Sequence, residues 1–115
     1  HLAVKIEPLR FGMNRTASDE DENLFFTQIR TLLAMRPDAT FRLTGHTCNI
    51  GDSRTNLSLS ERRARHVAQF LIRRGIPAAQ IVEVRGLGPD QPLADNSTLT
   101  GRRLNRRVEV EILAP

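Results

Sequence analysis

The first segment of the chain, residues 2–14, begins with the alternation that is typical of a β-strand. Leu2, Val4 and Ile6 are apolar, and small or charged residues stand between them. Side chains two positions apart point to the same face of a strand. The spacing therefore predicts a first strand with one buried face.

Between Ser18 and Pro37 the apolar spacing changes to that of a helix. Ser18 suits an N-cap, and the acidic run at residues 19–22 suits the positive end of a helix dipole. The apolar positions then follow at i, i+4, i+7 and i+8: Phe25, Ile29, Leu32 and Leu33. The pattern predicts an amphipathic helix that Pro37 ends.

A second strand and a second helix are predicted in the middle of the chain. Residues 40–46 favour a strand that ends in a glycine turn, and residues 59–75 show the clearest helical pattern. We expect Ser60 to be the N-cap of this helix and Gly75 to follow its C-terminus. Its predicted apolar stripe consists of Ala64, Val67, Ala68, Leu71 and Ile72.

Two further strands follow in the last third of the chain. Residues 81–86 and 107–113 alternate between apolar and charged side chains. Residues 89–101, between them, are predicted to be a long polar connection. The predicted order is βαβαβ-β, an α/β (α+β) two-layer sandwich with a mixed four-stranded sheet and helices on one face.

Length and composition indicate one globular domain over residues 1–115. The net charge of +4 suits anionic partners. Nucleic acid is not expected, because the chain has no Trp and no Tyr on which bases could stack. A single Cys excludes an internal disulfide.

No apolar run is long enough for a membrane-spanning helix. The chain also shows no secretory signal and begins with His1 in place of Met. We therefore expect a segment of a longer precursor. The sequence leaves open whether the missing part is a β-barrel, a lipid anchor or a transmembrane helix.

Four polar motifs occur in a fixed order along the chain. They are TGHTCNIG at 44–51, NLSLSERRA at 56–64, GLGPDQP at 86–92 and NSTLTGRRLNRRVEV at 96–110. As an ordered set they closely resemble the OmpA-like C-terminal domain. That family includes peptidoglycan-associated lipoproteins and the periplasmic part of the flagellar stator protein.

The resemblance implies a module on the periplasmic face of the outer membrane that binds peptidoglycan non-covalently. In the family, an Asp after G-H-T and an Arg in L-S-x-x-R-A hold the free amino-acid end of diaminopimelate in the stem peptide. A planar guanidinium suits the carboxylate and an anion suits the ammonium. The implied function is to tether the outer membrane or an envelope complex to the cell wall.

Mapped onto this sequence, the carboxylate-binding residue is Arg63. The other positions that match the family's pocket are Thr47, Asn56, Asn14 and Arg106. With Ser60 as N-cap, Arg63 is expected in the first helical turn, where free backbone N–H groups add to anion binding. Arg106 has an equally good interpretation as a structural residue that pairs with backbone or a carboxylate.

Cys48 stands at the position of the family's Asp, and the interval of 15 residues to Arg63 is preserved. Gly12 likewise replaces the Asp of a first-strand motif. A neutral thiol accepts hydrogen bonds weakly, so two acidic positions near the pocket are lost. Arg63 could favour the thiolate, or Asp52 could supply the anion from another direction.

Other chemistries are less well supported by the sequence. Cys48 and His46 are two apart and could form a thiol–base dyad, but the resemblance implies no catalytic use of this His. A metal site would need His1 and His66 as ligands in addition to His46 and Cys48, and these residues lack the spacing of metal-ligand pairs. We expect no enzyme, no metal and no cofactor.

The serious alternative is a domain that keeps the fold but has lost or altered wall binding. Such a domain would act as a protein-interaction scaffold or bind a modified ligand. Its basic clusters could serve an acidic protein partner: Arg62, Arg63, Arg65, Arg102, Arg103, Arg106 and Arg107.

Overall fold

The computed structural model describes residues 6–13 and 15–114 of the chain. Along the chain the elements are β1 (Leu9–Arg10), α1 (Asp19–Met35), β2 (Thr40–His46), α2 (Ser53–Arg73), η1 (Ala78–Gln80), β3 (Ile81–Gly86), α3 (Leu99–Asn105) and β4 (Arg107–Ala114). The strands form one mixed sheet in the order β1-β4-β2-β3. β2 and β3 are parallel, and β4 runs antiparallel to both β1 and β2. The predicted α/β architecture is therefore confirmed.

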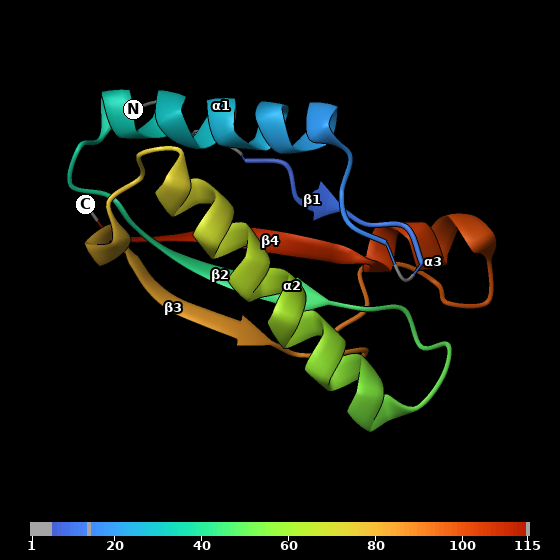
Figure 1. Ribbon diagram of the computed structural model, residues 1–115. Coiled ribbons are helices and arrows are strands. Elements are labelled where there is room, and N and C mark those ends of the chain that lie inside the picture. Colours follow the sequence, from blue (N-terminus) through green and yellow to red (C-terminus); the bar gives the residue numbers. More distant parts are fainter. Residues whose placement is uncertain (1–5, 14, 115) are drawn as a thin grey trace.

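The core lies between the sheet and the two long helices, which cover the same face of the sheet (Figure 1). α1 begins as predicted, because the Ser18 hydroxyl accepts a hydrogen bond from the Asp21 N–H at 3.1 Å. Its buried side chains meet those of α2 and the sheet over one continuous cluster. The largest fully buried members include Phe25, Ile29, Leu32, Phe41, Leu43, Leu71 and Val108.

Close contact with the sheet fixes the position of α2. A Cβ on Gly45 would lie 2.1 Å from the backbone oxygen of Ser60, and a Cβ on Gly86 would lie 2.4 Å from the backbone nitrogen of Glu61. Only glycine permits such an approach of helix to strand. The middle of α2 therefore lies directly on β2 and β3, close to where these two strands end.

The start of α2 corrects one prediction. The helix begins at Ser53, and its N-cap is Asp52, whose carboxylate accepts from the Thr55 N–H at 2.9 Å and the Thr55 hydroxyl at 3.0 Å. Ser60 instead lies within the helix, where its hydroxyl donates to the Leu57 carbonyl and accepts from the Gly88 N–H. Arg63 is consequently about three turns into the helix, and the helix N-terminus does not contribute to binding at this residue.

The other differences concern the first strand, two apolar side chains and one helix. Leu2 and Val4 lie outside the described residues, and the strand observed in this segment is Leu9–Arg10. Ile72, from the predicted apolar stripe of α2, is 42% exposed, and Val82, an apolar residue of the alternating segment 81–86, is 53% exposed. Neither belongs to the core. At Val82 the cause is a shift in the β2–β3 register, since Phe41 pairs with Ile81 and Arg42 with Glu83.

The predicted polar connection at 89–101 contains the start of a helix. α3 begins at Leu99, with the Thr98 hydroxyl accepting from the Gly101 N–H at 2.9 Å. Asn105 at its end is fully buried, and its amide oxygen accepts from the N–H groups of Leu93 and Ala94. These hydrogen bonds hold the loop against the end of α3 and so position the next residue, Arg106.

The face of the sheet away from the helices carries ion pairs. Arg42 bridges Glu83 at 3.2 Å and Glu111 at 2.5 Å. His46 lies on this face, with its Nε2 atom 3.6 Å from a carboxylate oxygen of Glu109. Alternation along β2 and β4 therefore separates an apolar face under the helices from a polar one, as predicted.

Candidate functional site

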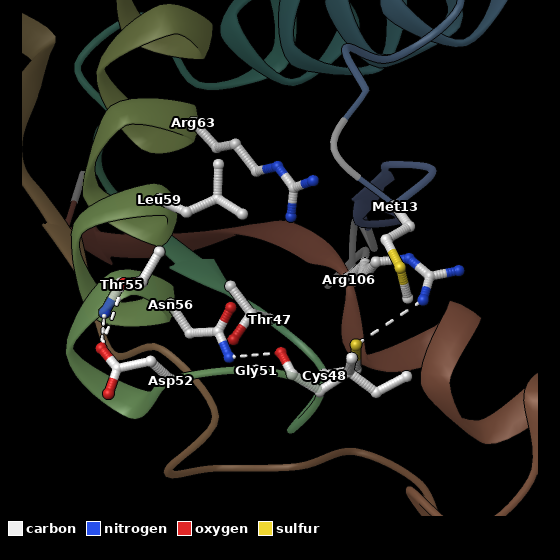
Figure 2. A pocket seen from close by; sticks show the side chains of 11 residues that line it. Met13, Thr47, Cys48, Gly51, Asp52, Thr55, Asn56, Leu59, Arg63 and Arg106 are labelled. Atoms are coloured by element: carbon white, nitrogen blue, oxygen red, sulfur yellow. Dashed lines mark hydrogen bonds between the residues drawn. The ribbon is translucent and has the colours of Figure 1, made fainter.

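A pocket of about 220 Å³ lies beyond the end of β2, against one side of α2 (Figure 2). Its walls come from four parts of the chain: the segment after β1, the loop between β2 and α2, one side of α2, and the turn that leads from α3 into β4. The lining residues are Met13, Thr47, Cys48, Ile50, Gly51, Asp52, Thr55, Asn56, Leu59, Arg63 and Arg106.

Arg63 provides a buried cation on the pocket wall, and it is 6% exposed. Its Nη2 donates to the Gly12 carbonyl at 3.0 Å, and its guanidinium lies over the Phe11 ring at 4.9 Å. Its Nε and Nη1 atoms are buried and have no hydrogen-bond partner within residues 6–13 and 15–114. Buried N–H groups are nearly always satisfied, so these two donors are suited to an anionic ligand.

The electrostatic surroundings of Arg63 also favour an anion. Burial, and secondarily the positive charge of Arg106, lower the pKa of Arg63 to about 10. The side chain therefore stays protonated at neutral pH, but it lacks the counter-ion that such burial normally requires. A carboxylate bound in the pocket would supply this counter-ion.

Arg106 joins the pocket to the first strand. Its Nε donates to the Phe11 carbonyl at 3.0 Å, and the Phe11 N–H donates back to the Arg106 carbonyl at 2.9 Å. Its Nη1 lies 3.6 Å from the sulfur of Cys48. Arg106 thus pairs with backbone and lines the pocket at the same time, which combines the two interpretations that the sequence left open.

Cys48 is a free cysteine, 4% exposed, directly beyond the end of β2. Figure 2 shows its sulfur facing Arg106 across the pocket. The guanidinium groups of Arg106, which contacts this thiol, and of Arg63 therefore belong to the same pocket. A thiol is a weak hydrogen-bond acceptor, so it offsets their charge far less than a carboxylate would.

Two of the remaining predicted positions also reach the pocket. The Thr47 N–H donates to the Gly88 carbonyl at 3.0 Å, and its hydroxyl is buried without a partner in the described part of the chain. Asn56 donates from its amide to the Ile50 carbonyl at 2.9 Å. Asn14 lies outside the described residues. The structure thus brings together Arg63, Cys48, Thr47, Asn56 and Arg106.

The pocket has further lining residues beyond those mapped from the family resemblance. Met13 and Leu59 add apolar surface, for which no sequence signal was available. Asp52 also lines the pocket, and Figure 2 shows its carboxylate beside Thr55. The N–H and hydroxyl of Thr55 hold the pKa of Asp52 below its ordinary value. Asp52 is therefore ionised at neutral pH, and part of its acceptor capacity is already used by the helix cap.

His46 and Cys48 have different partners, so the structure does not support the dyad. Burial is the main cause that lowers the pKa of His46, whose imidazole is directed to Glu109 on the open sheet face. The partner of Cys48 is Arg106. His66 lies beside Glu22 at 3.5 Å, away from both.

Residues 6–13 and 15–114 carry neither a metal-binding cluster nor a membrane-spanning helix. This part of the chain contains no cluster of three or more His, Cys, Asp or Glu side chains that could hold a metal ion. None of its helices combines the length and apolar character needed to cross a membrane.

Comparison with known proteins identifies the family. Residues 11–106 match the model of the OmpA family. The chain belongs to the OmpA family. The matched range contains every described residue of the predicted site.

Individual relatives of this OmpA-family chain agree with the assignment. It is 49% identical over 105 residues to the outer-membrane lipoprotein YfiB of Pseudomonas aeruginosa, a match over 90% of this chain and 61% of that protein. It is 36% identical over 110 residues to the peptidoglycan-binding protein ArfA of Mycobacterium tuberculosis, a match over 96% of this chain and 33% of that protein. The chain thus spans about three-fifths of one curated relative and a third of the other.

The fold of the OmpA-family chain is also found in solved structures. It superimposes on the peptidoglycan-associated lipoprotein of Burkholderia pseudomallei with a TM-score of 0.82 and 26% sequence identity. The superposition covers 92% of this chain and 89% of the lipoprotein.

Proposed function

We propose that this domain binds peptidoglycan non-covalently and recognises the free carboxylate of a diaminopimelate side chain in the stem peptide. It would thereby tether the outer membrane, or a complex in the envelope, to the cell wall from the periplasmic side. The names of two relatives, a peptidoglycan-binding protein and a peptidoglycan-associated lipoprotein, support this proposal. It is a binding function, and no reaction is proposed.

The buried guanidinium of Arg63 is the observation that carries the proposal. Its Nε and Nη1 donors are unsatisfied among the described residues, and Nη1 shares the outer edge of the guanidinium fork with Nη2, which also donates to the Gly12 carbonyl. That edge fits the two oxygens of a carboxylate. The Thr47 hydroxyl, also buried without a described partner, provides a third donor from the same pocket.

The ammonium of the same amino-acid end is bound less strongly in this proposal. Cys48 offers a weak acceptor, and the ionised Asp52 is engaged by Thr55. Loss of one charge-assisted hydrogen bond costs on the order of 1.5–3 kcal/mol, about 10- to 100-fold in affinity. We infer that binding depends mainly on the carboxylate.

Co-sedimentation with isolated peptidoglycan sacculi tests the proposed function. The purified domain is expected to pellet with sacculi, and free diaminopimelate is expected to release it by competition. If the domain stays in the supernatant at protein concentrations that saturate a positive control, the proposal is wrong.

A second candidate function, that of a scaffold or a receptor for an altered ligand, is favoured by one observation. Arg106 contacts the sulfur of Cys48 where the family pattern has a carboxylate, and Arg63 lines the same pocket. If sacculi do not bind but an acidic protein partner does, this alternative replaces the first.

Replacement of Cys48 by Asp is expected to strengthen binding of free diaminopimelate by about tenfold or more. The new carboxylate adds a charge-assisted hydrogen bond to the ligand ammonium, and its charge is balanced by Arg106. Calorimetric titration measures the change. Cys48→Asn is the matched control, because it has the shape of Asp without the charge, and it should leave the affinity within about threefold of wild type. Equal affinities for the Asp and Asn variants would contradict the assignment of Cys48 to the ammonium position.

A further inference from the structure

A second groove of about 420 Å³ adjoins the pocket along α2. Leu59 and Arg63 line both cavities, so these two side chains of α2 form the boundary between the pocket and the groove. The groove is lined by Phe11, Arg15, Thr16, Leu59, Arg62, Arg63 and His66. Four of these residues are spaced i, i+3, i+4 and i+7 on α2, which places them along one face of the helix.

The groove is positively charged and has an apolar floor. No carboxylate is among its lining residues. Glu22 lies at its edge, 3.5 Å from His66. The side chains of Arg15 and Arg62 are exposed and form no ion pair or hydrogen bond within residues 6–13 and 15–114. Phe11 and Leu59 supply the apolar surface between them.

Arg63 makes the two cavities parts of one surface. Its guanidinium lies over the Phe11 ring, which faces the groove, while Figure 2 shows the same side chain reaching into the pocket. A ligand whose carboxylate binds to Arg63 therefore has its next atoms beside the groove. Complementary charge then indicates what the groove can hold, namely an anion carried farther along the same ligand.

We propose that this groove is a second subsite, which takes the free carboxylate of the side-chain-linked glutamate in a stem peptide whose diaminopimelate side-chain carboxylate lies against Arg63. Arg62 and Arg15 bind this second carboxylate, and Phe11 and Leu59 pack against the aliphatic part of the peptide. The inference rests on the proposed function and deepens it. The domain then recognises two separated carboxylates rather than one amino-acid end.

The test compares three probes: free diaminopimelate, a synthetic tripeptide of alanine, side-chain-linked glutamate and diaminopimelate, and the same tripeptide with the glutamate carboxylate amidated. Wild type is expected to bind the tripeptide more tightly than either other probe. Arg62→Ala should weaken tripeptide binding by about three- to tenfold, the range for one partly exposed charge-assisted contact. It should leave binding of free diaminopimelate and of the amidated tripeptide within about twofold of wild type.

Arg65→Ala is the matched control, since Arg65 is on the same helix, is 65% exposed and pairs with Glu61 rather than lining the groove. It removes the same charge and should change none of the three affinities by more than about twofold. Equal effects of Arg62→Ala and Arg65→Ala, or equal loss on all three probes, would overturn the second subsite while leaving the Arg63 pocket intact. Failure of wild type to bind any of the probes would overturn the pocket and the groove together.

Discussion

Replacement of Arg63 by alanine is expected to abolish binding of the domain to peptidoglycan sacculi and to free diaminopimelate. The change removes the buried fork whose Nε and Nη1 atoms have no other described partner. Truncation of one member of a buried charge pair costs at least about 2 kcal/mol, so affinity should fall roughly 30-fold or more. Calorimetric titration with diaminopimelate and co-sedimentation with sacculi measure the loss.

The Arg63→Ala variant should remain folded. In the folded domain the pKa of Arg63 is lowered to about 10, below its ordinary value, which means that burial makes its charge less favourable than in the unfolded chain. Removal of that charge therefore does not remove a source of stability. Circular dichroism should show the wild-type spectrum, and Arg63→Lys should recover only part of the affinity, because an ammonium cannot form the two-pronged contact. Wild-type affinity in a folded Arg63→Ala variant would refute the pocket assignment.

Replacement of Leu71 by alanine is expected to lower the free energy of unfolding by about 2–5 kcal/mol. Leu71 is 1% exposed and belongs to the core cluster between α2 and the sheet. The substitution removes apolar contacts and leaves a cavity, since the glycine contacts of α2 with β2 and β3 prevent the helix from moving inward. Chemical denaturation monitored by circular dichroism measures the change.

Gln69 provides the control for this prediction, because it is exposed on the same helix two residues away. Gln69→Ala should change the free energy of unfolding by less than about 0.5 kcal/mol. Small and equal effects at the two positions would show that α2 does not present the face described here to the sheet.

Much of the fold could be predicted because long elements show clear periodicity. The apolar positions of α1, and the stripe at Ala64, Val67, Ala68 and Leu71 on α2, follow the helical spacing and are buried or packed on the core. β2 was predicted over the residues it occupies. Burial against the core requires apolar residues at the spacing of the helix or strand, so these elements are visible in the sequence.

Other features depend on contacts that no local pattern contains. α3 is a short helix with a polar sequence, and it is held by the buried amide of Asn105 rather than by an apolar face. The true N-cap of α2, Asp52, was overlooked because Ser60 is an equally suitable cap residue by type. The exposure of Val82 follows from a register shift between two strands, which periodicity within one strand cannot indicate.

The site likewise combines features that the sequence predicts with features that depend on tertiary contacts. The family resemblance implied that Arg63, Cys48, Thr47 and Asn56 belong to one site, and the structure brings them to one pocket. The contact between Arg106 and Cys48 joins residues 58 positions apart, and the second groove combines the first segment with α2. Both arise from tertiary packing, so neither could be read from the sequence.

The central claim is that the pocket recognises a free carboxylate through Arg63. Calorimetric titration of the wild-type domain with a stem tripeptide, and with the same tripeptide amidated at the diaminopimelate side-chain carboxylate, tests this claim most directly. We predict binding of the free acid and a loss of roughly 30-fold or more on amidation, because the neutral amide cannot serve as the counter-ion of a buried guanidinium. Equal affinity for the two tripeptides would contradict the account.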